Sequence, residues 1–412
     1  NRSNHKVYPM GDNGGGAIHN WSDNVTIRNS VFRNNYAENE GGAIYTWGEN
    51  FHLENTRFEN NTTETQGGGI YINYYDVTLK NTQFVGNKAD EGGGIFISGT
   101  SLSVENSQFT NNEASEKGGA IYNHRFSEIS TINKSEFYDN AAKQGGAIYN
   151  FSDEGLKISN AIFHKNLASD KGGAIYNYRN IDVANATFIA NTNTAFIIPT
   201  YANTPYNPNI SHIYNSIFYQ NTPKTGGFRA DIHSENVSAD HGEKDIRRNI
   251  TQSYTAGTAN LVGVNPLFIN NATNFRLQQT SPAVNYGVNA LYNQVSATPA
   301  GTSTDLGNQP RLVGSSIDLG AYELQPVVLA CPAMTLPTPN ATNVPITTNI
   351  SWNAIANATG YRISIGTTAG GTNIVNNLNV GNVTTYNHPT DLSPGTTYYV
   401  RITPYNAVSA TA

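Results

Sequence analysis

The chain has little charge, one cysteine and no long apolar run, and each shortage excludes a class of protein. Charged residues make up 13% of the 412 residues, the net charge is −6 and no cluster of Lys and Arg occurs, which argues against nucleic acid or an anionic membrane as a partner. No apolar run approaches the ~20 residues of a membrane-spanning helix. The single cysteine, Cys331, excludes an intrachain disulfide, so packing and hydrogen bonds must hold the fold.

What the chain has instead is an internal repeat rich in glycine and asparagine. The motif Gly-Gly-(Ala/Gly)-Ile occurs seven times with a period of 25 to 27 residues, seven copies of Phe-x-x-Asn are interleaved with it, and an eighth follows at residues 218–221. Repeats of this length bury their apolar face only against their neighbours. The Gly-Gly pairs begin at Gly15, Gly41, Gly67, Gly92, Gly118, Gly145 and Gly172; the phenylalanines are Phe32, Phe58, Phe84, Phe109, Phe137, Phe163, Phe188 and Phe218.

Each repeat contains short runs in which apolar and polar residues alternate, for example residues 25–27 and 43–45. Alternation over three to five residues predicts strands, and the period leaves no room for a helix with its loops. We therefore expect an all-β fold, a right-handed parallel β-helix with two or three short strands per turn. Each strand should pair in parallel with its equivalent about 4.8 Å away along the axis.

Two asparagine columns flank the phenylalanine column. One lies three residues after each Phe, from Asn35 to Asn221, and the other lies three residues before it, from Asn29 to Asn215, broken only by Lys134. Asparagine can hold a turn, and its amide can hydrogen-bond to the amides above and below. The Gly-Gly pairs fit places where the backbone bends sharply or approaches closely.

The residues one and three positions after each repeat isoleucine should point outward if the isoleucine points inward, which predicts an exposed aromatic face. Rings stacked in register could bind sugar rings, or could simply stabilise neighbouring turns, each pair by about 0.2 to 1 kcal/mol. The ligand-binding candidates on this face are Trp21, Tyr45, Trp47, Tyr71, Tyr122, His124, Tyr149, Phe151, Tyr176 and Tyr178.

Residues 12 to about 225 resemble the repeats of chlamydial polymorphic outer-membrane proteins, because both motifs recur in phase over roughly half of the chain. This resemblance implies a right-handed parallel β-helix on a cell surface, often associated with adhesion. It brings no catalytic residue with it.

Two further resemblances cover the rest of the chain. Residues 260–326 resemble the choice-of-anchor Q segment of secreted Bacteroidota proteins, through the words Asn265-Pro266-Leu267-Phe268, Asp305-Leu306-Gly307-Asn308, Pro310-Arg311 and Ile317-Asp318-Leu319-Gly320-Ala321-Tyr322-Glu323. A proline- and glycine-rich segment after a repeat suits a cap over the open end of the solenoid.

Residues 327–412 resemble a fibronectin type III module that stops before its last strand. The matching segments contain Trp352, residues 360–365 and residues 392–402, with Tyr398 as the tyrosine-corner residue. The domain prediction is therefore a β-helix over 1–259, with irregular turns after 225, a cap over 260–326 and a β-sandwich over 327–412.

Catalytic and metal-binding groups are sparse in the sequence. Charges alternate in sign down one column, from Arg28 and Glu54 to Lys80 and Glu105, which indicates cross-turn pairing rather than an acid/base site. We predict no catalytic residue and no cofactor. The stretch from Asp231 to Asp245 offers weak metal candidates in His233, Asp240 and His241, although its spacing matches no familiar ligand motif.

The prediction for function is a non-enzymatic bacterial protein, secreted by a type IX route or displayed on the outer membrane of a Gram-negative cell. Its partners would be polysaccharides or cell-surface glycans and further domains of the same parent chain. Two alternatives stay open. One is a polysaccharide lyase or glycoside hydrolase acting on the aromatic face, as in other β-helices. The other is a unit of extracellular fibres.

Overall fold

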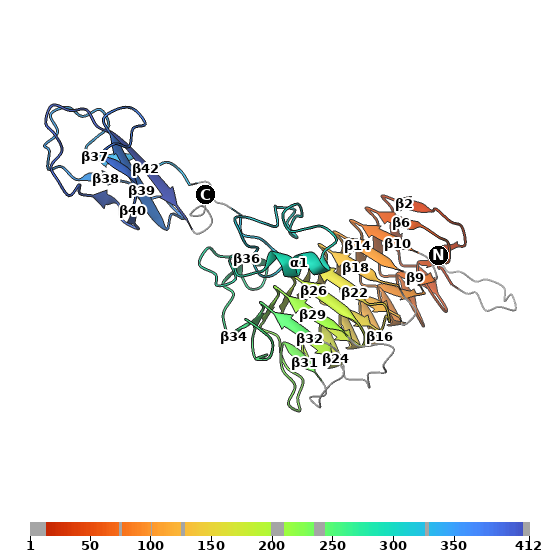
Figure 1. Ribbon diagram of the computed structural model, residues 1–412. Coiled ribbons are helices and arrows are strands. Elements are labelled where there is room, and N and C mark those ends of the chain that lie inside the picture. The colour runs from red at the N-terminus through yellow and green to blue at the C-terminus, as the bar shows by residue number, and fades with distance from the viewer. Residues whose placement is uncertain are drawn as a thin grey trace. The chain divides into compact units, whose positions relative to one another are not determined.

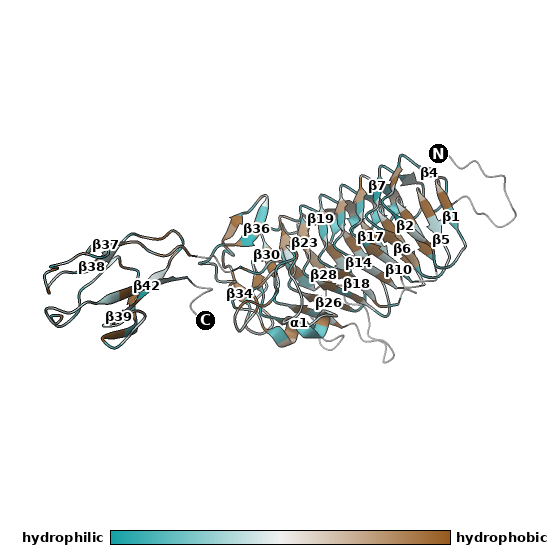
Figure 2. Cartoon of the chain, turned by 90° about the horizontal axis from the view of Figure 1, so that it is seen from above, coloured by the Kyte–Doolittle hydropathy of each residue, from teal (hydrophilic) through white to brown (hydrophobic). Residues whose placement is uncertain are grey.

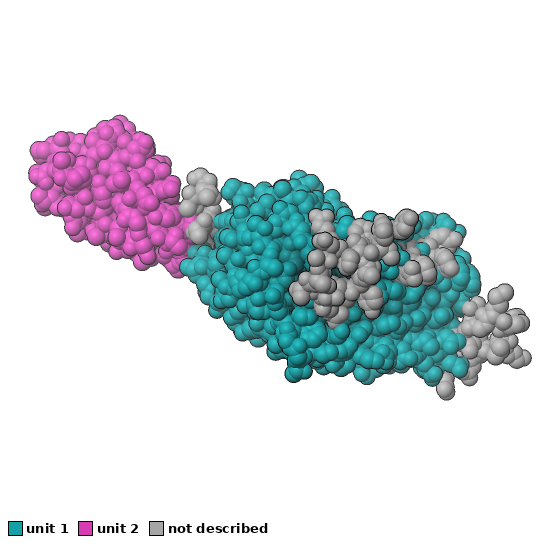
Figure 3. Space-filling model, turned by 60° about the horizontal axis from the view of Figure 1, so that its bottom comes forward, with its two compact units in different colours: residues 1–323 teal, residues 324–412 magenta. Residues whose placement is uncertain are grey.

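The computed structural model describes residues 14–73, 76–99, 101–124, 128–198, 210–234, 244–325 and 329–406. The chain forms two compact units, residues 1–323 and residues 324–412 (Figure 3). Each unit has its own hydrophobic core. The finer division of the first unit at residue 259 stays a prediction.

The first unit is a parallel β-solenoid, in which each strand lies beside the equivalent strands of the neighbouring turns (Figure 1). Every strand pair within its four long sheets is parallel, so each strand hydrogen-bonds to its equivalent one repeat away. Hydrophobic residues, brown in Figure 2, recur along the stacked strands. This confirms the all-β solenoid predicted from the repeat.

The strands of the four sheets follow one another in chain order. The first sheet contains β1 (Ile18–Asn20), β5 (Ile44–Thr46), β9 (Ile70–Asn73), β13 (Ile95–Ser98), β17 (Ile121–Asn123), β21 (Ile148–Asn150), β25 (Ile175–Asn177), β28 (Phe196–Ile198) and β31 (Ile232–Ser234). The second contains β2 (Thr26–Arg28), β6 (Phe51–Glu54), β10 (Val77–Lys80), β14 (Leu102–Glu105), β18 (Ser130–Asn133), β22 (Leu156–Ser159), β26 (Ile181–Ala184), β29 (Ser211–Tyr214) and β32 (Lys244–Arg247). The third contains β3 (Val31–Arg33), β7 (Arg57–Glu59), β11 (Gln83–Val85), β15 (Gln108–Thr110), β19 (Glu136–Tyr138), β23 (Ile162–His164), β27 (Thr187–Ile189), β30 (Ile217–Tyr219), β33 (Ile250–Thr251) and β34 (Leu261–Val262).

A fourth sheet was not expected from the sequence, which predicted two or three strands per turn. Its strands bury one small residue each, such as Ala89 or Ala114, between polar neighbours, so they lack the apolar alternation that marks the other strands. They are β4 (Tyr36–Ala37), β8 (Thr62–Thr63), β12 (Lys88–Glu91), β16 (Glu113–Lys117), β20 (Ala141–Gln144) and β24 (Leu167–Lys171).

The repeat phenylalanines form one continuous stack inside the solenoid. Phe58, Phe84 and Phe109 are register partners, and their ring centroids lie 4.8 and 4.9 Å apart with nearly parallel planes. The stack continues from Phe32 to Phe218 with every neighbouring pair stacked. The sequence prediction that like residues stack on like is confirmed.

The asparagines three residues after each Phe form a buried ladder whose polar atoms are satisfied by one another. The Oδ1 atom of Asn87 accepts hydrogen bonds from the backbone N–H and the Nδ2 of Asn61, at 3.0 and 2.9 Å. The Nδ2 of Asn87 donates to Asn112 and to the carbonyl oxygen of Phe58. Because no amide in this pattern loses its partners, the column can lie inside a core.

Glycine is required at the repeat corner for two separate reasons. Gly67 has a φ of +70°, in the left-handed region that favours glycine. At Gly68 an added Cβ would lie 2.3 Å from the carbonyl oxygen of Gly93 in the next turn. The second asparagine column also adopts left-handed φ, from Asn29 to Asn215, and Lys134 shares that conformation.

Residues 260–323, here called the flanking segment, pack against the side of the solenoid. The segment contains β35 (Phe268–Asn270), β36 (Asn274–Leu277) and α1 (Asn289–Val295). Phe268, Phe275 and Leu319 bury the outward-facing Ile189 and Ile217 of the third sheet. These described contacts are with the outward side of the third sheet, and the cap over the open end stays a prediction.

The repeat corners hold the flanking segment by hydrogen bonds. Asn185 Nδ2 donates to the carbonyl oxygen of Asp318, and Asn215 exchanges two bonds with the backbone of Val288. Lys134 Nζ donates to Thr304 Oγ1 at 2.8 Å. Lys134, the one residue that replaces asparagine in the column three residues before each Phe, therefore contacts the flanking segment.

A buried cluster of polar side chains lies within the flanking segment. Arg311 is fully buried, donates to the carbonyl oxygen of Asp318 and lies 3.5 Å from a carboxylate oxygen of Glu323. Glu323 also accepts from the backbone of Asp318, and its own N–H donates to Asp305. These four residues belong to the sequence motifs that resemble choice-of-anchor Q. Their hydrogen bonds fix the backbone of this segment.

The second unit consists of two small antiparallel sheets around Trp352, Tyr361 and Ile363. The Tyr398 hydroxyl hydrogen-bonds to the backbone of Ser393, as expected for a tyrosine corner. The strands are β37 (Met334–Leu336), β38 (Ile350–Trp352) and β41 (Thr385–Tyr386) in one sheet, and β40 (Val375–Gly381), β39 (Gly360–Gly366) and β42 (Tyr399–Tyr405) in the other.

Candidate functional site

The aromatic column directly after the repeat isoleucines is buried, which corrects the prediction that it is exposed. Its residues do lie on the other side of the strand from the isoleucines, in a separate cluster. Each ring centroid lies 5.0 to 5.2 Å from the next; Tyr122 meets both of its neighbours edge to face, and the other pairs are stacked. Exposed fractions range from 2 to 8% for Tyr45, Tyr71, Phe96, Tyr122, Tyr149 and Tyr176.

Charged side chains add to the cover of this column. Lys117 Nζ lies 5.4 Å from the ring centroid of Tyr122 and 5.5 Å from that of Tyr149, and it pairs with Glu91 at 3.0 Å. Burial, with Glu91 nearby, raises the pKa of Tyr122 well above its usual range. These contacts agree with the stabilising interpretation of the column.

The second aromatic column, three residues after the isoleucines, is more accessible. Trp47, His124, Phe151 and Tyr178 are half-buried, and Trp21 is 57% exposed. Arg179 lies over both Phe151 and Tyr178 at 5.6 Å. Trp21 therefore presents the largest free aromatic surface on this face.

Trp21 and Trp47 form a stacked pair at the turn after β1 and β5. Their ring centroids lie 5.1 Å apart, and the ring planes differ by 16°. His19 stacks on Trp21 at 5.4 Å. Exposed polar residues follow each tryptophan, and they pair across turns through Glu49 N–H to Asp23 Oδ1 and Asn50 Nδ2 to Asn24 Oδ1.

The structure also brings together a polar row that sequence reasoning missed. Asp182 on β26, His212 on β29 and Asp245 on β32 are successive register partners on the outward side of the second sheet. His212 Nδ1 lies 2.8 Å from Asp182 Oδ1. The row could have been found by aligning the last, irregular repeats with the strands before them.

Neighbouring residues neutralise this polar row. Asp245 accepts from the hydroxyl of Tyr214 at 2.8 Å and pairs with Arg247. Burial, helped by Asp245, raises the pKa of Tyr214 to about 12. The row is thus paired across turns, as the Arg28–Glu54 pair is, whose atoms lie 2.8 Å apart.

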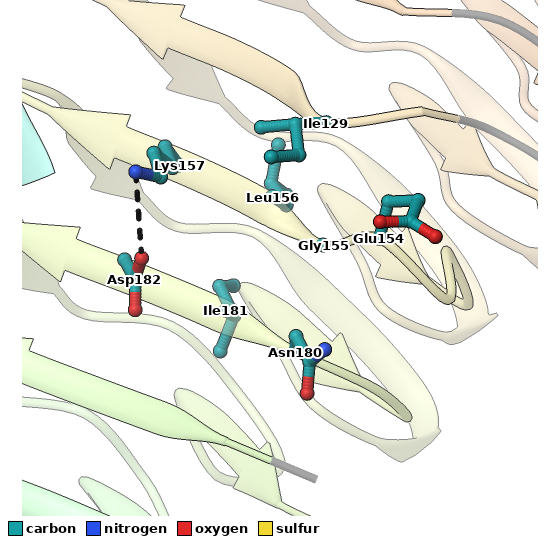
Figure 4. A pocket seen from close by; sticks show the side chains of 8 residues that line it. All are labelled: Ile129, Glu154, Gly155, Leu156, Lys157, Asn180, Ile181 and Asp182. Atoms are coloured by element: carbon teal, nitrogen blue, oxygen red, sulfur yellow. Dashed lines mark ion pairs between the residues drawn. The ribbon is translucent and has the colours of Figure 1, made fainter. Parts of the chain in front are cut away.

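A small hollow of about 30 Å³ lies beside this row (Figure 4). Lys157 and Asp182 form its polar side and pair at 4.0 Å, while Ile129, Leu156 and Ile181 form its apolar side. Space of this size suits a few water molecules and no sugar ring.

The metal candidates do not form a site among the described residues. His233 lies on β31 of the first sheet and packs on Phe228 at 4.2 Å, whereas Asp245 lies in the second sheet. Asp240 and His241 lie outside the described residues. Within the described ranges, no three His, Cys, Asp or Glu side chains are close enough to hold a metal ion together.

Two family models match the solenoid. Residues 3–130 match the right handed beta helix region, and residues 160–178 match the Chlamydia polymorphic membrane protein repeat. The chain carries a right-handed β-helix region with a repeat of this membrane-protein type. Comparison with curated proteins gives no match. Among the described residues of this β-helix protein, no helix has the length and hydrophobicity to cross a membrane.

Proposed function

We propose that this is a non-enzymatic bacterial surface or secreted protein whose β-helix binds glycans at the Trp21–Trp47 pair. The match to the Chlamydia polymorphic membrane protein repeat supports a location outside the cell or on the outer membrane of a Gram-negative bacterium. The resemblances to choice-of-anchor Q and to fibronectin type III, found on sequence words alone, agree with that location and with linkage to further domains.

The observation that supports the proposal is the stacked pair of indole rings, in which the Trp21 side chain is 57% exposed. An indole ring offers a large rigid apolar face together with one N–H donor, which suits the apolar face of a sugar ring. Asp23, Asn24 and Asn50 supply nearby polar groups that could bind hydroxyls. The buried tyrosines are unsuitable as contacts, so the binding surface is narrower than the ten residues predicted from the sequence.

Glycan-array binding of the chain tests the proposal. We expect binding that falls at least about tenfold in Trp21→Ala, equivalent to about 1.4 kcal/mol. Val31→Ala is a matched control, because Val31 is equally exposed, at 59%, but belongs to the third sheet. No glycan binding by the chain would reject the function, and binding unchanged in Trp21→Ala would reject the site.

A second candidate function, cleavage of a polysaccharide, is favoured only by the His212–Asp182 pair. A carboxylate on Nδ1 fixes the orientation of the imidazole, as a general base requires. The aromatic face itself is too closed to be that active site. If this alternative holds, the unchanged chain should release oligosaccharide products from acidic or neutral polysaccharides. The His212→Ala variant should release none.

A further inference from the structure

The second unit carries almost no charge, and what it carries is unevenly placed. Its charged residues are Arg362, Arg401 and Asp391, so its net charge is 2 − 1 = +1, against −7 for residues 1–323. Neither arginine makes an ion pair among the described residues of the unit. Two guanidinium charges therefore stand without a carboxylate partner.

Both arginines lie on the same outward face of one sheet. Arg362 on β39 is the register partner of Thr403, and Arg401 on β42 is the partner of Ser364. The arginines are thus diagonal neighbours, about 7–8 Å apart at the backbone. Their strand neighbours Ile363 and Ile402 point to the opposite side and pack in the core.

Two tyrosines flank the arginines on this face. Along β42 the outward positions are Tyr399, Arg401, Thr403 and Tyr405. The Tyr405 ring lies over Gly360, where an added Cβ would come 2.2 Å from its hydroxyl oxygen. Its hydroxyl donates to Asn379 at 2.9 Å, and Arg362 lies 5.5 Å from its ring centroid.

Tyr399, at the other end of the row, is 45% exposed. The face is therefore a strip of two arginines between two tyrosines. Tyr405 is held by its hydrogen bond to Asn379, neither arginine is paired with a carboxylate of the described residues, and Tyr399 is exposed. Arginine matches the planar fork of a carboxylate, and an aromatic ring matches the flat side of a sugar.

We propose that this strip, formed by Arg362, Arg401, Tyr399 and Tyr405, binds a carboxylated polysaccharide, a polymer of uronic acid units. The charge complementarity is local, since the rest of the protein is acidic and would repel such a polymer. Repeated carboxylates can reach both arginines at once, while the tyrosines stack on the sugars between them. This site is independent of the glycan site proposed on the β-helix.

Calorimetric titration of the full chain with oligogalacturonate tests the site, with a neutral cello-oligosaccharide of equal length as the comparison. We expect tighter binding of the acidic ligand than of the neutral one, and weaker binding of the acidic ligand in about 0.5 M salt, where charges are screened. Arg362→Gln with Arg401→Gln should weaken it at least about tenfold. Arg362→Lys with Arg401→Lys should give an intermediate loss, because the charge remains but the fork is gone.

The matched control is Arg28→Gln with Arg33→Gln, which removes the same charge from exposed residues of the first unit that are already paired with Glu54 and Glu59. Binding should persist in this control. A sulfated oligosaccharide shows whether the strip binds carboxylate more tightly than sulfate. Vesicles of anionic lipid show whether it binds a membrane surface instead. The site is rejected by absence of oligogalacturonate binding, by equal loss in the control, or by a preference for the vesicles.

Discussion

Asn35 donates two hydrogen bonds to one atom, the Oδ1 of Asn61 one turn away, through its backbone N–H and its Nδ2. The same pair of bonds recurs from Asn61 to Asn87 and onward to Asn221. Each buried amide is therefore satisfied only if the neighbouring turn places an amide oxygen at the same position, which Asn does along the column and Gln252 does at its end. This dependence explains why the asparagine column is unbroken inside the core.

Asn87→Ala should lower the free energy of unfolding by roughly 2–4 kcal/mol, because it leaves the N–H of Asn61 and one of the two Nδ2 hydrogens without an acceptor in a buried site, while Nδ2 keeps only its bond to the carbonyl oxygen of Phe32. Urea unfolding followed by circular dichroism measures this. Asn81→Gly is the control, since Asn81 is partly exposed and glycine accepts its φ of +51°. That control should stay within about 0.5 kcal/mol.

Gly68→Ala should destabilise the solenoid by at least about 3 kcal/mol, because its Cβ would meet backbone atoms of the next turn that have no room to move. The measurement is the midpoint of thermal unfolding. Gly301→Ala, in the flanking segment, is the comparison, as no atom lies within 4 Å of the added Cβ. Similar midpoints for both variants would contradict the close stacking.

Ile189→Lys should release the flanking segment from the solenoid. Ile189 is fully buried beneath that segment, so a lysine there would be a buried unpaired charge, with an expected loss of at least about 2 kcal/mol. Limited proteolysis should then cut within residues 260–323. Thr110→Lys changes the same repeat position outside the covered area and should leave the cleavage pattern as it is.

Stability should fall with rising pH through Glu323. Burial raises the pKa of Glu323 to about 8, from 4.5 in the unfolded chain, against the opposing effect of Arg311. Between these values the folded state keeps a proton that the unfolded state has released, so unfolding becomes easier by on the order of 1 kcal/mol per pH unit.

The check compares the chain with Glu323→Gln by urea unfolding at several pH values between about 5 and 8. The difference between the two curves isolates the contribution of Glu323 to stability. This comparison is needed because burial lowers the pKa of His164, which makes stability rise with pH below pH 6.5. Parallel curves would mean that Arg311 keeps the carboxylate ionised throughout.

The repeat made the solenoid predictable, because contacts between equivalent residues follow from the period alone. Phe84 had to meet Phe58 and Phe109 once the strands were parallel and in register. The fourth sheet escaped prediction since a strand that buries only one alanine shows no apolar alternation. The exposure of Tyr122 was also misjudged, because pointing outward from a strand does not prevent coverage by the rings of neighbouring turns and by Lys117.

The sequence by itself determined the period, the parallel pairing and the residues of each ladder, since those are one-dimensional facts that repeat at every turn. Only the tertiary structure decided where the non-repeating parts lie. The flanking segment covers Ile189 and Ile217 because the path of the chain outside the repeat brings distant residues together. Such contacts occur once, so no periodicity in the sequence records them.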